Sequence, residues 1–469
     1  MKRRIISTLF ILSGGACTLQ AQQLMTLEEC RRLTLQNSEN IRIAAKQTEQ
    51  AVAGKQAART AYLPKVGASG AMAYVFKDID MTSYLPTFVP DASGQLQPNL
   101  MLHPVTGEPV IGPDGNPVFN MYACYPLTVS IKGAYMAGIT LEQPLYAGGK
   151  IIAGNKMAQT GVDIAGENSI LQRMNAVVEA DRAYWIYVAV NEKVKLLEKY
   201  AELLDVLTAS VQSAYDVEMT GRNDLLKVQT RRGSVAYEMQ RARNGQELAR
   251  MSLCRVTGLD YATRILPTDS LVQIDGQPLP EPSGDVTLRP EYHILQQQVE
   301  LETQQIKMTQ ADFLPTVGIG IGYQYLGGAK MSGQGMNFKL PFAMLSVNMP
   351  LFHFGEGAKK IKSARLQRDI RQLEFEKNSR LLELELKQTG KDLQDAYALV
   401  GVAESALEQA AENLRVSADN YEVGMEPIVN LLDAQAQWQQ AYSNVIEART
   451  NFKIKETEYL KTAGAIKTE

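Results

Sequence analysis

The sequence predicts an α+β membrane protein in which long helices and short strands follow one another twice along the chain. Three observations predict this fold class: a long-range repeat, two nearly proline-free stretches with a helical period, and segments with a two-residue period. The chain has 469 residues, of which 45% are hydrophobic and 21% are charged. Its formal net charge of −3 shows no excess of basic residues of the kind that nucleic-acid binding requires.

The long-range repeat places two copies of one pattern at a constant offset of 206 residues. Pro144-Leu145-Tyr146 in the first copy corresponds to Pro350-Leu351-Phe352 in the second. Further along, Tyr215-Asp216-Val217-Glu218-Met219 corresponds to Tyr421-Glu422-Val423-Gly424-Met425. The sequence therefore predicts an internal two-fold repeat.

Prolines separate the predicted elements. None occurs between Leu145 and Leu266, and only Pro427 interrupts the stretch from Leu351 to Glu469. Because proline lacks a backbone N–H and clashes with the preceding turn, each stretch predicts a very long helix, a turn and a second helix. A helix of about 70 residues would be roughly 100 Å long.

Both long stretches carry a heptad repeat. Apolar residues recur every seven positions, and small residues occupy the companion positions in the second stretch, which favours a coiled coil with close helices. The alternative interpretation is an ordinary amphipathic helix in a bundle. The repeating positions are Leu386, Leu393, Val400, Leu407, Leu414 and Tyr421, with Ala396, Ala403, Ala410 and Ser417 beside them, and in the first stretch Ala183, Val190, Leu197, Leu204 and Val211.

Four segments alternate apolar and polar residues with the two-residue period of a β-strand. They lie at 66–76, 127–144, 317–326 and 342–351, and the first is a weaker, Gly- and Ala-rich example. Strands of about ten residues with tyrosines near their ends are typical of membrane β-strands. One face of a soluble sheet is the alternative interpretation.

The N-terminus has the residue order of a secretion signal. Basic residues at 2–4 precede an apolar run at 5–12 and then small residues. We expect cleavage after Ala21. Cys17 only weakly resembles a lipidation site, so lipidation stays open.

These patterns divide the chain into four parts. In each structural repeat the predicted order is helix, strand, loop, strand and long helical hairpin. The first repeat has 45 extra residues between its strands, in a long loop at 77–125 whose role as a lid, a contact surface or decoration stays open. The parts are a signal peptide at 1–21, the first repeat at 22–269, a proline-rich linker at 270–290 and the second repeat at 291–469.

The predicted strands imply an oligomer. No segment after the signal has 18 consecutive apolar residues, so any membrane span must be a β-barrel. Four strands per chain cannot close a barrel, because small membrane barrels need about eight. Three chains would supply a 12-stranded β-barrel that continues into an α-helical coiled-coil barrel. This geometry implies a conduit.

The sequence contains no constellation that is typical of catalysis. There is no phosphate-binding loop, no HExxH zinc motif and no GxSxG nucleophile motif. We therefore predict no enzyme activity, no cofactor and no metal site. The histidines and the cysteines beyond the signal fit no metal, triad or redox spacing: His103, His293, His353, Cys30, Cys124 and Cys254.

Several motifs together resemble those of the TolC family of outer membrane efflux proteins, also called outer membrane factors. They are the Pro-Leu-Tyr/Phe strand ends followed by glycine, the Leu-Pro-x-Val-Gly strand starts at Leu63 and Leu314, and Tyr421-Glu422-Val423-Gly424 followed by Val429 to Gln435. The resemblance covers the chain from about Leu24 to Gly464. The resemblance rests on the combination of these motifs, because each motif alone is weak evidence for the family.

The resemblance implies a homotrimeric channel-tunnel in the outer membrane of a Gram-negative bacterium, extending into the periplasm. Such a channel belongs to a tripartite efflux or secretion system and passively conducts substrates. It would work with a periplasmic adaptor (membrane fusion) protein and an inner-membrane pump. The alternative is a secreted coiled-coil scaffold protein without a pore. The cargo and the pump class are not predicted.

The resemblance also places a periplasmic gate just beyond the two hairpin turns. The matching positions are Asp224 in the first copy and Asn430 with Asp433 in the second, and a trimer would arrange each carboxylate in a threefold ring. Arg222 and Glu426 are candidates for a closing network. In the alternative interpretation, Asp224 caps a helix that starts at Leu225 and Asp433 is simply solvated.

The same turns are the predicted docking tips for the adaptor. Gly221 and Gly424 permit left-handed backbone, and Pro427 can begin a helix. The candidate docking surface runs from Tyr215 to Arg222 and from Tyr421 to Pro427. Both tyrosines could instead be ordinary residues of the helical seam.

Overall fold

The computed structural model describes residues 23–84, 87–120, 126–271, 284–331 and 333–466. The predicted signal peptide, Cys124 and the centre of the predicted linker lie outside the described residues. The chain divides into two compact units. We call them the helical unit (Met1–Lys55, Ala158–Thr303 and Leu366–Glu469) and the sheet unit (Gln56–Met157 and Gln304–Arg365).

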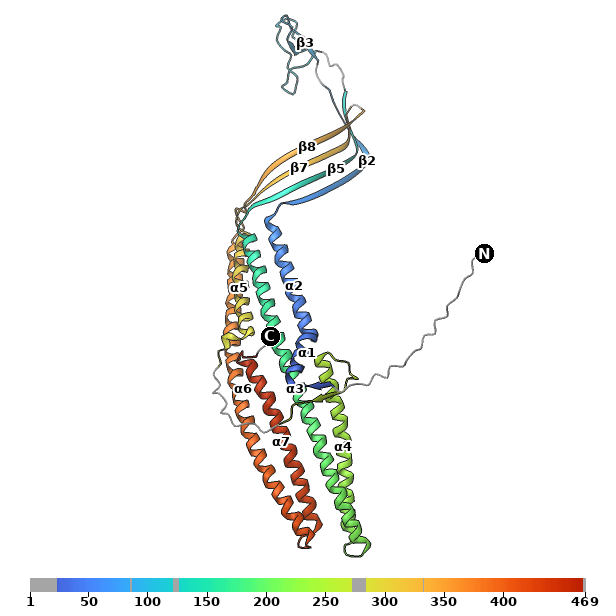
Figure 1. Cartoon of the computed structure of the whole chain (residues 1–469). Helices are drawn as coiled ribbons and strands as arrows, with labels where there is room; N and C mark the ends of the chain where they lie inside the picture. Colours follow the sequence, from blue (N-terminus) through green and yellow to red (C-terminus); the bar gives the residue numbers. More distant parts are fainter. Residues whose placement is uncertain (1–22, 85–86, 121–125, 272–283, 332, 467–469) are drawn as a thin grey trace, which may run out of the picture. The chain divides into compact units, whose positions relative to one another are not determined.

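The sheet unit contains one four-stranded antiparallel sheet, in which the strands lie side by side (Figure 1). The strand order is β2-β5-β7-β8, so β2 and β8 are its two edges. All four predicted strands are present, and they are longer than the alternating patterns indicated; β8 ends before Met349 and Leu351. The strands are β2 (Lys65–Tyr84), β5 (Pro126–Ala147), β7 (Thr316–Met331) and β8 (Gln334–Asn348).

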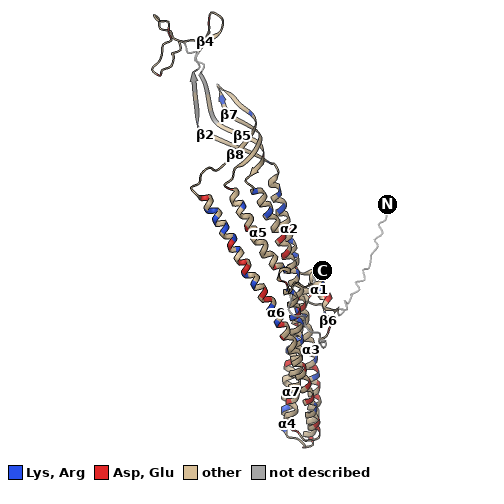
Figure 2. Ribbon diagram, turned by 90° about the vertical axis from the view of Figure 1, so that its left-hand side faces the viewer, with Lys and Arg blue, Asp and Glu red and all other residues tan. Residues whose placement is uncertain are grey.

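The two faces of this sheet differ in side-chain size. Pairing of Val66 with Leu141, and of Leu141 with Ile321, places large apolar residues on one face. Many of these side chains are exposed in the single chain, and Figure 2 shows few charged residues on the strands compared with the helices. The sheet therefore presents an apolar face that nothing else in the described chain covers. The face includes Val66, Met72, Tyr74, Ile139, Ile321, Tyr323, Leu345 and Val347.

The extra residues of the first repeat form a small hairpin between β2 and β5. Its strands are β3 (Phe88–Pro90) and β4 (Leu96–Pro98), and isolated bridges such as Leu100 with Phe119 order the remainder. Residues 87–120 include no buried side chain. The structure therefore contains more order in the predicted long loop than its turn-forming sequence indicated.

The helices include two of 67 residues each, α3 (Lys150–Asp216) and α6 (Glu356–Glu422). At 1.5 Å per residue each is about 100 Å long, as the proline pattern predicts. Each is followed by a turn and a shorter helix, α4 or α7, so that two hairpins result. None of the helices in the described ranges has the length and hydropathy that crossing a membrane requires. The other helices are α1 (Leu27–Asn37), α2 (Glu39–Arg59), α4 (Arg222–Thr257), α5 (Pro290–Ala311) and α7 (Ile428–Thr462).

The heptad positions form the core of the helical unit. Leu197, Leu204 and Val211 are buried in α3, and Leu386, Leu393 and Val400 are buried in α6. Near the turns, α3 and α4 pack against α7 through one cluster of apolar side chains. The two hairpins are therefore held together by their seams. This cluster consists of Leu207, Val211, Leu225, Val228, Ile428 and Leu431.

A pair of short parallel strands was not predicted from the sequence. β1 (Gln23–Met25) pairs with β6 (Ile265–Pro267) over two buried tyrosines of α3. The Tyr187 hydroxyl donates to the Ile265 carbonyl at 2.6 Å, and the Tyr184 hydroxyl donates to the Met25 carbonyl at 3.0 Å. This pair fixes the start of the described chain against the middle of α3.

One buried carboxylate joins three helices. Asp181 in α3 is 0% exposed. Its oxygens accept hydrogen bonds from Arg31 Nε of α1 at 2.7 Å and from Thr457 Oγ1 of α7 at 2.6 Å. The ion pair with Arg31 offsets the cost of burying the charge. Asp181 thus ties helices of both sequence repeats together.

The two hairpin turns use different residues for the left-handed backbone that ends a helix. Gly424 has φ 76°, as glycine at this position predicts, but its counterpart in the other turn is Glu218, with φ 61°. The expectation for Gly221 was wrong, since its φ is −83° and it lies at the N-cap of α4. A side chain at φ > 0 is strained, so the first turn holds the less favourable residue.

We expect Gly424→Ala to destabilise the second turn by about 1 kcal/mol through backbone strain alone. A Cβ at this position would meet no atom within 4 Å, so no clash adds to the strain. The loss would speed amide hydrogen exchange in the turn about fivefold, since tenfold corresponds to 1.4 kcal/mol. Glu218→Gly is the reverse test and should slow exchange in the first turn. Equal amide exchange rates in the second turn of the wild type and of Gly424→Ala would contradict the predicted backbone strain.

Candidate functional site

The candidate site consists of the two hairpin turns and the first turns of α4 and α7, which lie at one end of the helical unit (Figure 1). The turns span 217–221 and 423–427. The apolar cluster of α3, α4 and α7 described above lies directly behind them. Leu414, Tyr421 and Leu432 pack against this cluster. The seam therefore positions both turns side by side.

Asp224 lies within the first turn of α4, which begins at Arg222. It is not the cap of a helix that starts at Leu225, because Gly221 occupies the N-cap. Its Oδ1 pairs with Lys227 Nζ at 3.0 Å, and its Oδ2 accepts from Thr220 Oγ1 at 3.4 Å. A carboxylate at this place also interacts favourably with the positive end of the helix dipole.

The second turn arranges its polar residues along α7, with Pro427 at the N-cap. Asn430 Nδ2 donates to Glu426 Oε1 at 3.0 Å, and Gln437 Nε2 donates to Asp433 Oδ2 at 2.6 Å. Glu426 Oε2 is shielded from solvent and has no hydrogen-bond partner among the described residues. A neutral neighbour on α7 thus orients each acidic side chain, Asp433 on the same helix and Glu426 in the turn just before it.

Tyr421 faces the first hairpin. Its ring is half-buried in the cluster behind the turns. Burial raises the pKa of Tyr421 above its usual value, and the nearby Asp224 carboxylate raises this pKa further. Tyr421 is therefore both a seam residue and a neighbour of the candidate gate.

The structure brings only part of the predicted network together within one chain. Tyr421 and Asp224 are close, but no ion pair in the described part of the chain joins Arg222 to Glu426 or Asp433. The closing network stays a prediction about the assembled protein.

Two pairs of apolar residues lie within the predicted docking stretches, although the sequence analysis did not single them out. Met219 is 83% exposed and Met425 is 80% exposed, and Val217 and Val423 are exposed beside them. They occupy corresponding positions in the two copies of the repeated turn motif. The signal was the recurring Val-x-Met within that motif, which was read only for its tyrosine and its glycine. Exposed apolar side chains at recurring positions are typical of a binding surface.

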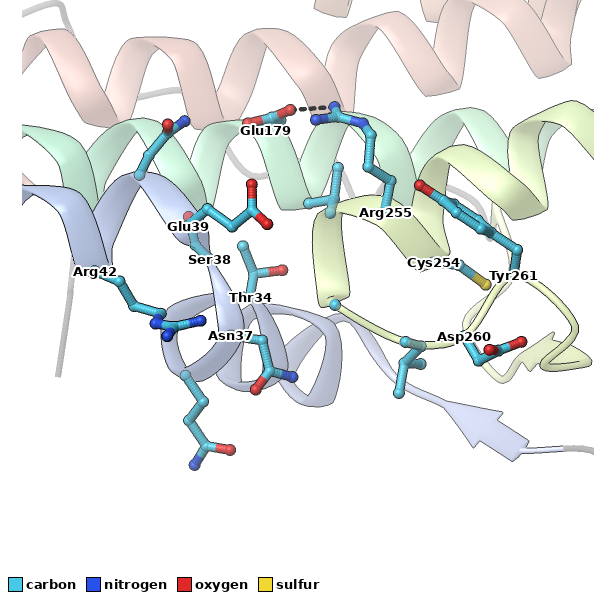
Figure 3. Close-up of a pocket in the computed structure, with 15 residues that line it drawn as sticks. Thr34, Asn37, Ser38, Glu39, Arg42, Glu179, Cys254, Arg255, Asp260 and Tyr261 are labelled. Carbon is cyan, nitrogen blue, oxygen red and sulfur yellow. Dashed lines mark hydrogen bonds and ion pairs between the residues drawn. The ribbon is translucent and has the colours of Figure 1, made fainter.

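A second concave region lies where α1 meets α2, beside the end of α4 (Figure 3). The cavity has a volume of about 1010 Å³. Glu179 and Arg255 form an ion pair at 2.5 Å across it, and Asn37 Nδ2 donates to the Thr257 carbonyl at 2.8 Å. These contacts hold the helix ends together. In the described ranges, no three His, Cys, Asp or Glu residues lie where they could hold a metal ion.

Comparison with known proteins agrees with this architecture. Residues 289–465 match the family model described as "Outer membrane efflux protein". No curated protein matches the sequence significantly. The fold matches the CmeC outer membrane channel of Campylobacter jejuni with a TM-score of 0.70 and 15% identity, covering 94% of this chain and 86% of that chain.

Two other solved structures give the same result. The outer-membrane channel OprN matches with a TM-score of 0.70 and 15% identity, covering 94% of this chain and 90% of OprN. The outer membrane protein VceC of Vibrio cholerae matches with a TM-score of 0.67 and 14% identity, covering 93% and 96%. The helix-rich α+β fold is therefore that of outer-membrane channels. The stretch that matches the family model lies almost wholly within the second predicted repeat, which also contains the motifs at Leu314 and at Tyr421 to Gln435.

Proposed function

We propose that three copies of this chain form a channel-tunnel in the outer membrane of a Gram-negative bacterium, extending into the periplasm. The channel passively conducts substrates that an inner-membrane pump delivers through a periplasmic adaptor. It is the outer-membrane part of a tripartite efflux or secretion system. The family match and the channel fold support this function, and the protein is not an enzyme.

The observation that carries the proposal is the incomplete sheet. Its two edge strands, β2 and β8, have unpaired backbone on one side, and one face is apolar and exposed. Unpaired backbone in a lipid environment costs several kcal/mol for each group. Joining β8 of one copy to β2 of the next removes both edges. Three copies then close a 12-stranded barrel, whose apolar face meets the lipid.

The helices extend the same assembly. Two 67-residue helices per chain, each with a buried heptad seam, supply a coiled-coil barrel about 100 Å long. The competing interpretation, a secreted scaffold without a pore, gives no role to a sheet with an exposed apolar face. The channel-tunnel uses both the sheet and the helices.

The hairpin turns form the periplasmic gate in this proposal. Three copies of Asp224 and of Asp433 make two acidic rings, with Asn430 adding a neutral ring beside them. Carboxylates held close together repel one another and attract cations. Arg222 and Glu426 close the mouth through contacts between neighbouring chains. The narrow end therefore admits cations in preference to anions.

The adaptor docks on the same turns. The proposed docking surface includes Tyr215, Gly221, Tyr421, Gly424 and Pro427. The recurring valine and methionine pairs add exposed apolar side chains to this surface. Methionine is well suited to such a surface because its unbranched side chain adapts to a partner. The two turns of one chain thus present two similar docking sites.

Cell fractionation tests the proposed location and assembly. The mature protein should sediment with outer membranes, require detergent for extraction, and migrate as a trimer that becomes a monomer after boiling. A water-soluble, elongated molecule in the culture medium would favour the scaffold instead. Loss of the trimer without boiling would contradict the closed barrel.

A further inference from the structure

The face of the sheet opposite the large apolar residues contains a hollow of about 420 Å³. This volume falls within the range of about 300–1,000 Å³ that is typical of small-molecule sites. The hollow lies near the strand ends that join the helices. Residues of all four strands line it, including Lys65, Thr140, Glu142, Gly320, Phe342 and Met344.

Glycines of β7 allow two β8 side chains that line the hollow to lie close against the β7 backbone. A Cβ at Gly320 would come within 3.0 Å of Met344 Cγ, and a Cβ at Gly322 would come within 2.6 Å of the Phe342 ring. The two β8 side chains therefore lie over bare backbone. Together they make an apolar wall that includes an aromatic ring and a thioether, both of which pack well against aromatic groups.

The strand register places a carboxylate opposite this wall. Glu142 pairs with Gly320, which pairs with Met344, so that only a glycine separates the acid from the wall. Two strand spacings are roughly 10 Å. Lys65 pairs with Glu142 from the far side, one strand farther from the wall. The side chain of Glu142 makes no hydrogen bond or ion pair with any residue within the described ranges.

We propose that this hollow binds small aromatic cations as they pass along the barrel, with the ring against Phe342 and Met344 and the amine at Glu142. Thr140 and Ser346 line the hollow as hydroxyl groups that can accept or donate hydrogen bonds. The inference rests on the proposed function, because only a channel wall brings cargo to this face. Binding is weak, since a conducting site must release its occupant.

Fluorescence polarisation of rhodamine 6G, an aromatic cation, with the purified full chain in detergent tests this site. Phe342→Ala should raise the Kd about tenfold, and Glu142→Gln about threefold, in line with the loss of one aromatic contact or one charge contact. Lys65→Gln should lower the Kd, because it removes a repelling charge. Leu345→Ala is the matched control: it lies on the same strand, faces the other way and should leave the Kd unchanged.

Fluorescein, an aromatic anion, should bind the wild type about tenfold more weakly than rhodamine 6G does. Rhodamine binding that is the same in Phe342→Ala and wild type, with trimers intact on unboiled gels, would overturn the site. Equal affinity for the two dyes would overturn its preference for cations. The same Phe342→Ala protein is also measured in a planar bilayer. The proposed function predicts single-channel conductance steps whether or not the dye binds, so steps without dye binding would overturn the binding site and leave the channel.

Discussion

Asp181→Ala is expected to lower the free energy of unfolding by about 1–3 kcal/mol, the usual cost of removing a buried acceptor, because the Arg31 side chain is 36% exposed and can be solvated when its partner is lost. The carboxylate is fully buried, and its removal leaves Arg31 and Thr457 without their partner. Because the three residues belong to three helices, the loss would loosen α7 and α1 against α3 together. Guanidinium unfolding followed by the helical circular dichroism signal measures the change.

Asp205→Ala is the matched control. Asp205 also lies in α3 and pairs with an arginine, Arg232, but both side chains are more than half exposed. Exposed ion pairs contribute little, so this variant should unfold like the wild type. Similar unfolding of the Asp181 and Asp205 variants would show that the buried pair does not hold the helices together.

Leu204→Ala should cost about 2–5 kcal/mol, because it removes three carbon atoms and leaves a cavity in a close-packed seam. Leu204 is 0% exposed and packs with Tyr200 and Val235, so that α3 and α4 lose their shared contact. The heptad predicts this burial from the sequence alone. The midpoint of thermal unfolding of the purified protein reports the loss.

The adjacent residue gives the control for this prediction. Leu203 is identical in side chain but 42% exposed, so Leu203→Ala should shift the midpoint far less. Equal shifts of the unfolding midpoint in the two variants would mean that Leu203 is packed as tightly as Leu204. The coiled-coil account of the hairpin would then need a second buried stripe.

Much of the fold could be predicted from local patterns. Heptads and proline spacing set the two long helices, because helices exclude proline and bury every third or fourth residue. Strand lengths were underestimated because apolar residues occupy both faces of β8, where Phe342 and Met344 lie opposite Leu345. The pair of β1 and β6 was missed, since three-residue strands carry no readable period and join residues about 240 positions apart.

The site was predictable only in outline. The repeat located both turns, and the family resemblance placed the candidate gate residues beside them. Neither could show that Glu218 adopts the left-handed backbone, which glycine normally provides. Asp181 was also missed, because an acidic residue in a helix usually faces solvent and its partners come from distant helices. The closing network of Arg222 and Glu426 stays a prediction, because no ion pair joins the two residues within the described part of the chain.

Single-channel conductance in a planar bilayer tests the central claim most directly, with wild type compared with the double variant Asp224→Ala/Asp433→Ala. The wild type should give small, cation-selective conductance steps, because the proposed trimer holds two acidic rings at the hairpin turns. Removing both carboxylates should enlarge the steps and reduce the selectivity, while Asp205→Ala, which removes an exposed acid far from the turns, should change neither. The absence of steps from folded, trimeric protein would contradict the channel-tunnel itself.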